Sequence, residues 1–290
     1  MVSEIIRPIE KGSSTRLLNK MLYTVFVAVI TILIAIPIIW VLLLSLKTNT
    51  EIFNSPLSLP KTIHFENYMV AFNKMHFFTL FKNTMYISII SIIGGYIINL
   101  LSSFAIARMK FGSGKVQHFF YMYFMTGIIM PVFVILFPIY MMNTKMGLIN
   151  TYWSMILPYL GWSVPMDTLL LVGALRNFPS AIEEAAIIDG CNITRLIVQI
   201  VTPIIKPTLV TVLIVSFLGM WNEFPLAVVM INKQEMYTIA LAVSFFKGLY
   251  SINYDTLTAA IVIIMVPQIA FYSIFQRHII EGVTAGAIKG

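Results

Sequence analysis

Six long stretches of mostly apolar residues dominate this chain of 290 residues. A helix needs roughly 20 such residues to cross the hydrocarbon core of a bilayer. Hydrophobic residues make up 59% of the chain and charged residues only 11%, whereas soluble domains carry about 25% charged residues. The sequence therefore predicts an all-α membrane protein with six transmembrane helices. The predicted spans are Met21–Leu46, Asn83–Ala107, His118–Met142, Tyr152–Leu175, Thr208–Ile231 and Thr256–Phe275.

Several other interpretations of the chain are excluded by simple counts. The single cysteine, Cys191, cannot form an intramolecular disulfide, and no zinc or iron–sulfur spacing is present, so we expect no metal site. The net charge of +7 does not predict nucleic-acid binding, because the basic residues lie mostly near the ends of the predicted spans. The first stretch, Met21–Leu46, is too long for a signal peptide and no small-residue cleavage site follows it, so we expect a retained span.

The Lys and Arg residues favour one orientation in the membrane. With both termini in the cytoplasm, 12 of the 19 Lys and Arg residues fall on the cytoplasmic side and 7 on the outer side. Cytoplasmic loops of membrane proteins carry such an excess. The sequence thus predicts a cytoplasmic N-terminal segment (1–20), a cytoplasmic loop (179–207) and a cytoplasmic C-terminal tail (278–290).

The loop between the fourth and fifth spans, residues 179–207, is longer and more charged than a membrane turn needs to be. Ser180 and Glu183 have the spacing of a capping box, in which two side chains satisfy free N–H groups at a helix start. Glu184 then falls in the first turn, where the helix dipole favours an anion. Gly190 can adopt the left-handed conformation that ends a helix. We expect a short helix exposed at the membrane surface.

A second short helix is predicted directly after this turn. Asn192 suits its N-cap and Pro203 its end, because proline lacks the N–H that would continue a helix. The whole loop is therefore predicted to fold as helix, tight turn and helix, an arrangement that suits docking against a partner. The alternative is an ordinary amphipathic connector.

The spacing within this loop resembles the EAA loop of bacterial ABC importer permeases. The matching residues are Glu184-Ala185-Ala186, then Gly190, Ile200 and Pro203. Thr202 departs from the pattern, since the family usually has Leu there, which puts only the local packing in doubt. The resemblance implies that a cytoplasmic ATPase docks on the loop. The residues that it implies for this coupling are Glu183, Glu184, Ala185, Ala186, Asp189 and Gly190.

Two acidic residues within predicted spans are candidates for contact with a substrate. Charge inside a bilayer is costly and usually faces the interior of the helix bundle. Asp167 lies in the fourth predicted span, and Glu223 lies in the fifth beside Trp221, Asn222 and Phe224. Aromatic rings stack on sugars, and acids and amides hydrogen-bond to hydroxyls, so these five residues form a candidate substrate path. The alternatives are a hydrogen-bonded staple between helices and a proton relay.

Two further segments resemble the maltose-type branch of these permeases. They are the Trp-Asn-x-Phe sequence at Trp221 and the glycine-rich run from Gln276 to Gly290. The resemblance implies a type I ABC importer permease fold, with the transmembrane domain at 80–277. It also implies that the tail reaches toward the ATPase dimer. The tail residues concerned are Glu281, Gly282, Gly286 and Lys289.

The resemblance implies a set of partners in a bacterial cell membrane. They are a second, related permease that completes a heterodimer, two ATPase subunits, identical or different, and an extracellular solute-binding protein that delivers a di- or oligosaccharide. This chain lacks a Walker A sequence, so it is expected to bind no cofactor and to be no enzyme itself, with ATP and Mg²⁺ held by the ATPase subunits. The alternative function is an ion- or proton-coupled secondary sugar transporter, which would explain the spans and the acids but not the loop.

Overall fold

The structure is a computed structural model that describes residues 13–109, 112, 114–248 and 252–287. In that part of the chain, all regular secondary structure is helical apart from one isolated bridge. Four helices are long and apolar enough to cross a membrane, and two bent helix pairs raise the number to as many as six. The chain is thus a mostly helical protein with four to six candidate spans. The four unbroken helices are α1 (Ser13–Leu44), α4 (Phe77–Arg108), α7 (Trp153–Asn177) and α13 (Tyr254–Ala287).

The third predicted span is not one straight helix. It consists of α5 (Gly114–Ile129) and α6 (Val132–Lys145), which meet at an angle of 102°. Pro131 stands at the N-cap of α6 with extended backbone angles. Proline donates no N–H and disfavours the helical conformation of the residue before it, so the chain turns there.

The fifth predicted span is also wrong as a continuous helix. Helix α11 (Lys206–Asn222) ends before Glu223, and α12 (Pro225–Met230) begins two residues later. Pro225 opens α12 at a position where the missing N–H costs nothing. The break therefore lies inside the Trp-Asn-x-Phe sequence.

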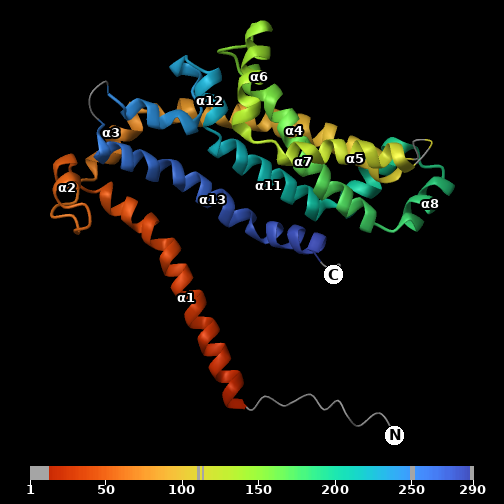
Figure 1. Ribbon diagram of the computed structural model, residues 1–290, viewed down its shortest axis with the longest axis horizontal. Helices are drawn as coiled ribbons and strands as arrows, with labels where there is room; N and C mark the ends of the chain where they lie inside the picture. The colour runs from red at the N-terminus through yellow and green to blue at the C-terminus, as the bar shows by residue number, and fades with distance from the viewer. Residues whose placement is uncertain (1–12, 110–111, 113, 249–251, 288–290) are drawn as a thin grey trace.

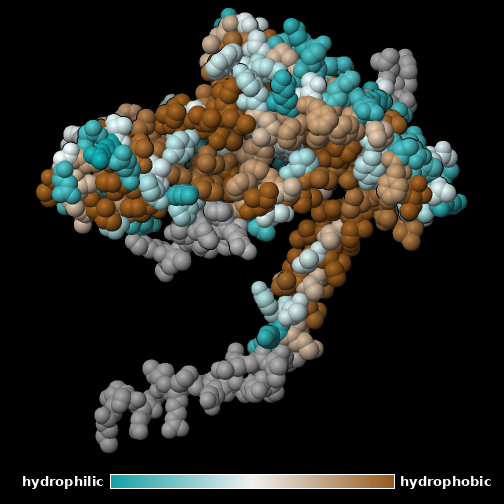
Figure 2. Space-filling model, turned by 180° about the vertical axis from the view of Figure 1, so that it is seen from behind, coloured by the Kyte–Doolittle hydropathy of each residue, from teal (hydrophilic) through white to brown (hydrophobic). Residues whose placement is uncertain are grey.

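The core of the bundle is the pair α4 and α7, which α11 joins on one side, with α13 packed against α11 (Figure 1). Small residues let α4 and α7 approach closely. A Cβ atom at Gly94 would lie 2.9 Å from the side chain of Leu160, and one at Gly95 would lie 3.1 Å from Ser163 Oγ. Helix α1 diverges from the bundle and buries none of its apolar stretch (Figure 1). Apolar side chains cover α1 and the middle of the bundle in Figure 2, as a lipid-facing surface requires.

The segments that join α1 to α4 and α12 to α13 contain ordered elements. The first holds two helices, α2 (Asn49–Asn54) and α3 (Glu66–Lys74). The second holds two 3₁₀ helices, η2 (Gln234–Met236) and η3 (Ile239–Phe246). Helix η3 does not lie on the surface as a connecting loop usually does. It packs into the core, where four of its apolar side chains are buried.

The opposite end of the bundle carries the loop that follows α7 (Figure 1). Its elements are α8 (Ser180–Ile188), α9 (Ile193–Arg195), the π-helical η1 (Leu196–Val201) and α10 (Thr202–Ile204). At the C-terminus, α13 continues as a helix through the first part of the predicted tail, including the backbone of Glu281, Gly282 and Gly286. Lys289 and residues 1–12 lie outside the described residues.

Packing between α5 and α7 yields a first prediction. A Cβ atom at Gly127 would lie 2.4 Å from Pro165 Cγ, well inside contact distance. We expect Gly127→Ala to lower the free energy of unfolding by about 1–3 kcal/mol through overpacking. The matched control is Gly161→Ala in α7, where an added Cβ atom would meet no heavy atom within 4 Å apart from the backbone of its own helix. Alanine should stabilise the helix there by up to about 1 kcal/mol. Thermal unfolding in detergent measures both, and equal shifts of Tm would contradict the packing.

Candidate functional site

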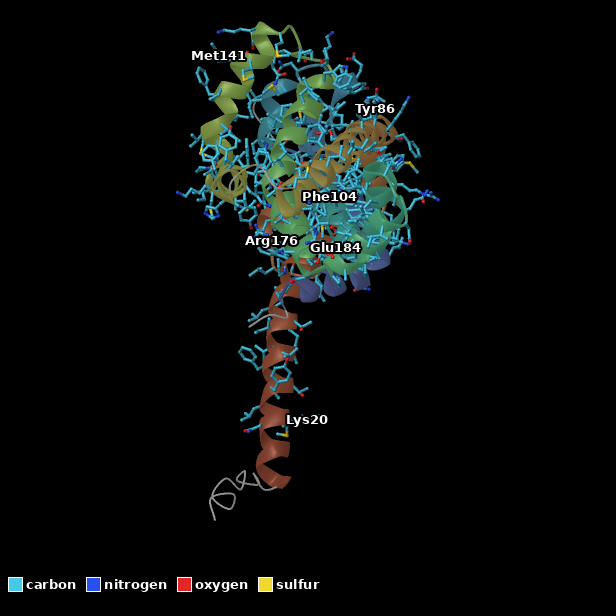
Figure 3. All side chains as sticks on the ribbon, turned by 90° about the vertical axis from the view of Figure 1, so that its right-hand side faces the viewer. Lys20, Tyr86, Phe104, Met141, Arg176 and Glu184 are labelled. Atoms are coloured by element: carbon cyan, nitrogen blue, oxygen red, sulfur yellow. The ribbon has the colours of Figure 1, made fainter. Side chains whose placement is uncertain are left out.

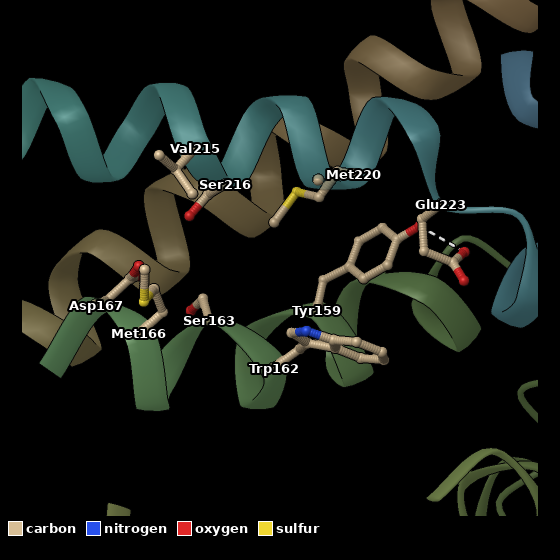
Figure 4. A pocket seen from close by; sticks show the side chains of 10 residues that line it. Tyr159, Trp162, Ser163, Met166, Asp167, Val215, Ser216, Met220 and Glu223 are labelled. Atoms are coloured by element: carbon tan, nitrogen blue, oxygen red, sulfur yellow. Dashed lines mark hydrogen bonds between the residues drawn. The ribbon is translucent and has the colours of Figure 1, made fainter. Parts of the chain in front are cut away.

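A cavity of about 290 Å³ lies between α7 and α11 (Figure 4). Polar and aromatic side chains of α7 form one wall, and α11 forms the other. The size suits a sugar ring or two, and the mixed lining is typical of small-molecule sites. The lining residues are Tyr159, Trp162, Ser163, Met166, Asp167, Val215, Ser216, Gly219, Met220 and Glu223.

Asp167 lies at one end of this cavity and is only 5% exposed. Its Oδ2 accepts a hydrogen bond from Asn99 Nδ2 of α4 at 2.6 Å, and the same nitrogen lies 2.7 Å from Ser163 Oγ. Ser216 of α11 lines the cavity nearby (Figure 4). Asp167 therefore joins α4 to α7, and it also contributes to the wall of the cavity.

Glu223 lies at the other end, at the break between α11 and α12 (Figure 4). Its carboxylate accepts hydrogen bonds from the N–H groups of Leu226 at 2.5 Å and Ala227 at 3.1 Å. Tyr159 of α7 donates its hydroxyl to the same carboxylate at 3.1 Å. Glu223 thus caps the first turn of α12 and ties it to α7, a geometry that fits the interhelical staple as well as the cavity lining.

The neighbours of Glu223 in the sequence point elsewhere. Trp221 is 2% exposed and packs against the rings of Phe81 and Phe217, with centroids 5.9 and 5.7 Å away. Asn222 is exposed and bonds to a backbone carbonyl of its own helix, and Phe224 is half-exposed. Among the described residues, the cavity lining includes Asp167 and Glu223 of the five predicted path residues but not these three.

Sequence reasoning missed Tyr159, Trp162 and Ser163. The signal was present, because Tyr159, Trp162 and Met166 follow the helical spacing that places side chains on one face. They share that face with Asp167.

The six predicted coupling residues divide between the two sides of α8. Ile187 and Ile188 beside them are 59% and 85% exposed, so the outer side of α8 is also apolar. Figure 3 looks at this end of the molecule and shows Glu184 on its surface. The exposed set is Glu184, Ala185, Asp189 and Gly190, and the buried set is Glu183 and Ala186.

The predicted capping box at the start of α8 is wrong. Ser180 is the first helical residue, the N-cap is Pro179, and no side-chain cap is formed. Glu183 instead bonds through Oε1 to Arg108 Nε at 2.8 Å, and Arg108 Nη2 donates to the carbonyl oxygen of Phe178 at 2.7 Å. Both charged side chains are largely buried. The charged hydrogen bond to the guanidinium at the end of α4 is stronger than a local cap would be. It holds α8 against the bundle.

The turn after α8 is confirmed, and so is the cap of the second helix. Gly190 has a φ of +83°, in the left-handed region that glycine favours. The side chain of Asn192 accepts a hydrogen bond from the N–H of Arg195 at 2.8 Å. Pro203, however, does not end the second helix, which continues to Ile204 before an 81° bend into α11. The π-helical turn before Pro203 places it at the start of α10, where no N–H is needed.

The contact between Arg108 and Glu183 yields a second prediction. Removing one partner of a buried ion pair leaves a charge without compensation, so Arg108→Met should lower the free energy of unfolding by about 3 kcal/mol. The double change Arg108→Met with Glu183→Leu should recover most of that loss, because no buried charge then remains. Thermal unfolding of both variants in detergent is the measurement. A double variant as unstable as the single one would show that the ion pair is not the source of the effect.

Comparison with known proteins places the chain among transport proteins. The diacetylchitobiose uptake system permease protein NgcG of Streptomyces coelicolor is 30% identical over 89% of this chain and 85% of its own. The probable starch degradation products transport system permease protein AmyC of Thermoanaerobacterium thermosulfurigenes is 30% identical, with 93% and 97% covered. A putative ABC transporter permease of a Caldicellulosiruptor species is 32% identical over 94% and 98%.

Solved structures show the same fold. A bacterial ABC transporter that imports the acidic polysaccharide alginate contains a chain that superimposes with a TM-score of 0.77 at 18% identity, covering 92% of this chain and 98% of that one. Residues 98–284 match the model of a protein family described as the inner membrane component of binding-protein-dependent transport systems. This confirms the resemblance to ABC importer permeases. The chain is a multi-pass membrane protein that belongs to the family of inner membrane components of binding-protein-dependent transport systems.

Proposed function

We propose that this chain is a permease subunit of an ATP-driven importer of a di- or oligosaccharide. An extracellular binding protein delivers the sugar, and a cytoplasmic ATPase supplies the energy. The observation that carries the sugar assignment is the lining of the cavity, which presents the rings of Tyr159 and Trp162 beside two carboxylates and two serine hydroxyls. Relatives named as permeases for diacetylchitobiose and for starch degradation products support it.

The coupling surface in this proposal is the exposed side of α8. Glu184 and Asp189 offer charge there, and the exposed Ile187 and Ile188 offer apolar area. A partner ATPase that binds this surface and moves it also moves the bundle, because Arg108 at the end of α4 is hydrogen-bonded to Glu183 of α8 and to the carbonyl oxygen just before α8. Force applied at the membrane surface thereby reaches the helices that line the cavity.

The remaining partners and the orientation are proposed on the family resemblance and the charge pattern. Both termini and α8 lie in the cytoplasm, and a second permease completes the pathway. The apolar stretch of the divergent helix α1 is exposed and can contact lipid or that second permease (Figure 1). The tail residues Glu281, Gly282, Gly286 and Lys289 reach toward the ATPase dimer. ATP and Mg²⁺ bind in the ATPase subunits.

The secondary transporter is the weaker candidate. It accounts for buried acids such as Asp167, but gives no role to an exposed helix with the spacing of an EAA loop. Membership in a family of binding-protein-dependent systems also favours the ATP-driven importer.

The experiment that tests this function is reconstitution with the second permease, the ATPase and the binding protein of the same importer. Binding protein loaded with maltotriose, diacetylchitobiose or arabinotriose should stimulate ATP hydrolysis and drive uptake. Gly190→Val should abolish stimulation, because a β-branched residue does not tolerate a φ of +83°, whereas Gly190→Asn should retain it. Uptake that follows an ion gradient and ignores ATP would overturn the proposal. Normal stimulation of ATP hydrolysis in Gly190→Val would show that α8 is not the coupling surface.

The position of the two tryptophans yields a separate prediction. Trp162 lines the cavity and is 38% exposed, so Trp162→Ala should raise the sugar concentration for half-maximal stimulation at least three-fold without changing Tm. Trp221 is a core residue, so Trp221→Ala should lower the free energy of unfolding by about 3–5 kcal/mol. Sugar titrations of ATP hydrolysis and thermal unfolding measure the two effects. If Trp221→Ala raised the sugar concentration for half-maximal stimulation and Trp162→Ala did not, the sugar would bind at Trp221 instead.

A further inference from the structure

The charges around the cavity are of one sign. Asp167 of α7 closes one end, and Glu223, directly after the end of α11, closes the other (Figure 4). The lining in the described part of the chain includes no Lys, Arg or His. A ligand between α7 and α11 therefore meets two carboxylates and no cation from this subunit.

The hydrogen-bonding character of the lining is dominated by acceptors. The Glu223 carboxylate is held by three donors, yet a carboxylate has about four acceptor positions. Asp167 accepts a hydrogen bond from Asn99 on Oδ2 and is also hydrogen-bonded by the hydroxyls of Ser163 and Ser216, so it too keeps about one acceptor position free. The acceptor positions that remain on the two carboxylates can bind groups that donate hydrogen bonds, such as the hydroxyls of a sugar.

An acidic sugar fits these ends poorly. Its carboxylate, sulfonate or phosphate only accepts hydrogen bonds, so it cannot bond to Asp167 or Glu223. A like charge in a site of low dielectric constant is repelled far more strongly than in water, and an anion without a partner cation loses its hydration. The rings of Tyr159 and Trp162 and the side chains of Met166 and Met220 add apolar surface, which suits the C–H faces of an uncharged ring.

We propose that this cavity selects uncharged saccharides and rejects acidic ones, with Asp167 as the main determinant of that selection. The fold alone does not decide the matter, because a chain of the same fold belongs to an importer of the acidic polysaccharide alginate. The charge of the lining decides it. This inference rests on the proposed import of sugar and adds the chemical class of the substrate.

A matched pair of probes tests the selection. Maltotriose, diacetylchitobiose and arabinotriose are each reduced at the reducing end to an uncharged alditol or oxidised there to an aldonate with one negative charge. Each derivative is loaded onto the binding protein, and its uptake by the full reconstituted complex is expressed per loaded binding protein. The wild-type complex should take up the aldonate at no more than about a tenth of the rate of the alditol.

Three variants assign the discrimination to the cavity. Asp167→Asn keeps an acceptor for Asn99 and removes the charge, so it should raise the ratio of aldonate to alditol uptake at least three-fold. Val215 lies on the opposite wall of the cavity. Val215→Lys should therefore also raise this ratio, because it supplies a cation while Asp167 stays unchanged. Glu235→Gln, an exposed acid in the outer loop, is the control and should leave the ratio unchanged.

The possible results separate this inference from the function on which it rests. A wild-type ratio near one overturns the selection, because it means that the pathway tolerates the charge. A ratio that neither Asp167→Asn nor Val215→Lys changes, while alditol uptake persists, also overturns it. If none of the three unmodified sugars is taken up in the presence of ATP, the proposed sugar import itself fails.

Discussion

Every break in a membrane-buried helix exposes backbone groups that water cannot reach, and this fold depends on the side chains that bond to them. Glu223 accepts from two N–H groups in the first turn of α12. Asn83 of α4 donates to two backbone carbonyls around η2, at 2.8 and 3.0 Å. Arg108 donates to the carbonyl between α7 and α8. Without these bonds, each buried backbone group left unpaired would cost several kcal/mol.

The same bonds place the functional parts. Glu223 can line the cavity only because α11 ends beside it, and Tyr159 then draws that end of the cavity toward α7. Arg108 holds Glu183 inward, which turns Glu184 to the outer side of α8. One polar contact thus stabilises the fold and sets which side of α8 is exposed.

Most of the helices could be predicted from the sequence because apolar length is a local property. Gly190 and Asn192 could be predicted for the same reason, since a left-handed turn and an N-cap depend on the residues themselves. The capping box failed because Arg108, 75 residues away, offered Glu183 a charged partner that no local pattern reveals. Trp221 failed to reach the cavity because the rings of α4 and α11 enclosed it.

The sequence by itself determined that the chain is a helical membrane protein and where its exposed helix–turn–helix loop lies, because hydrophobic length and turn chemistry are properties of consecutive residues. The tertiary structure decided where the spans break and which polar side chains share a cavity. Those depend on hydrogen-bond partners and packing neighbours far away along the chain. Asp167 and Glu223 lie 56 positions apart in the sequence, and only the packing of α7 against α11 makes them the two ends of one site.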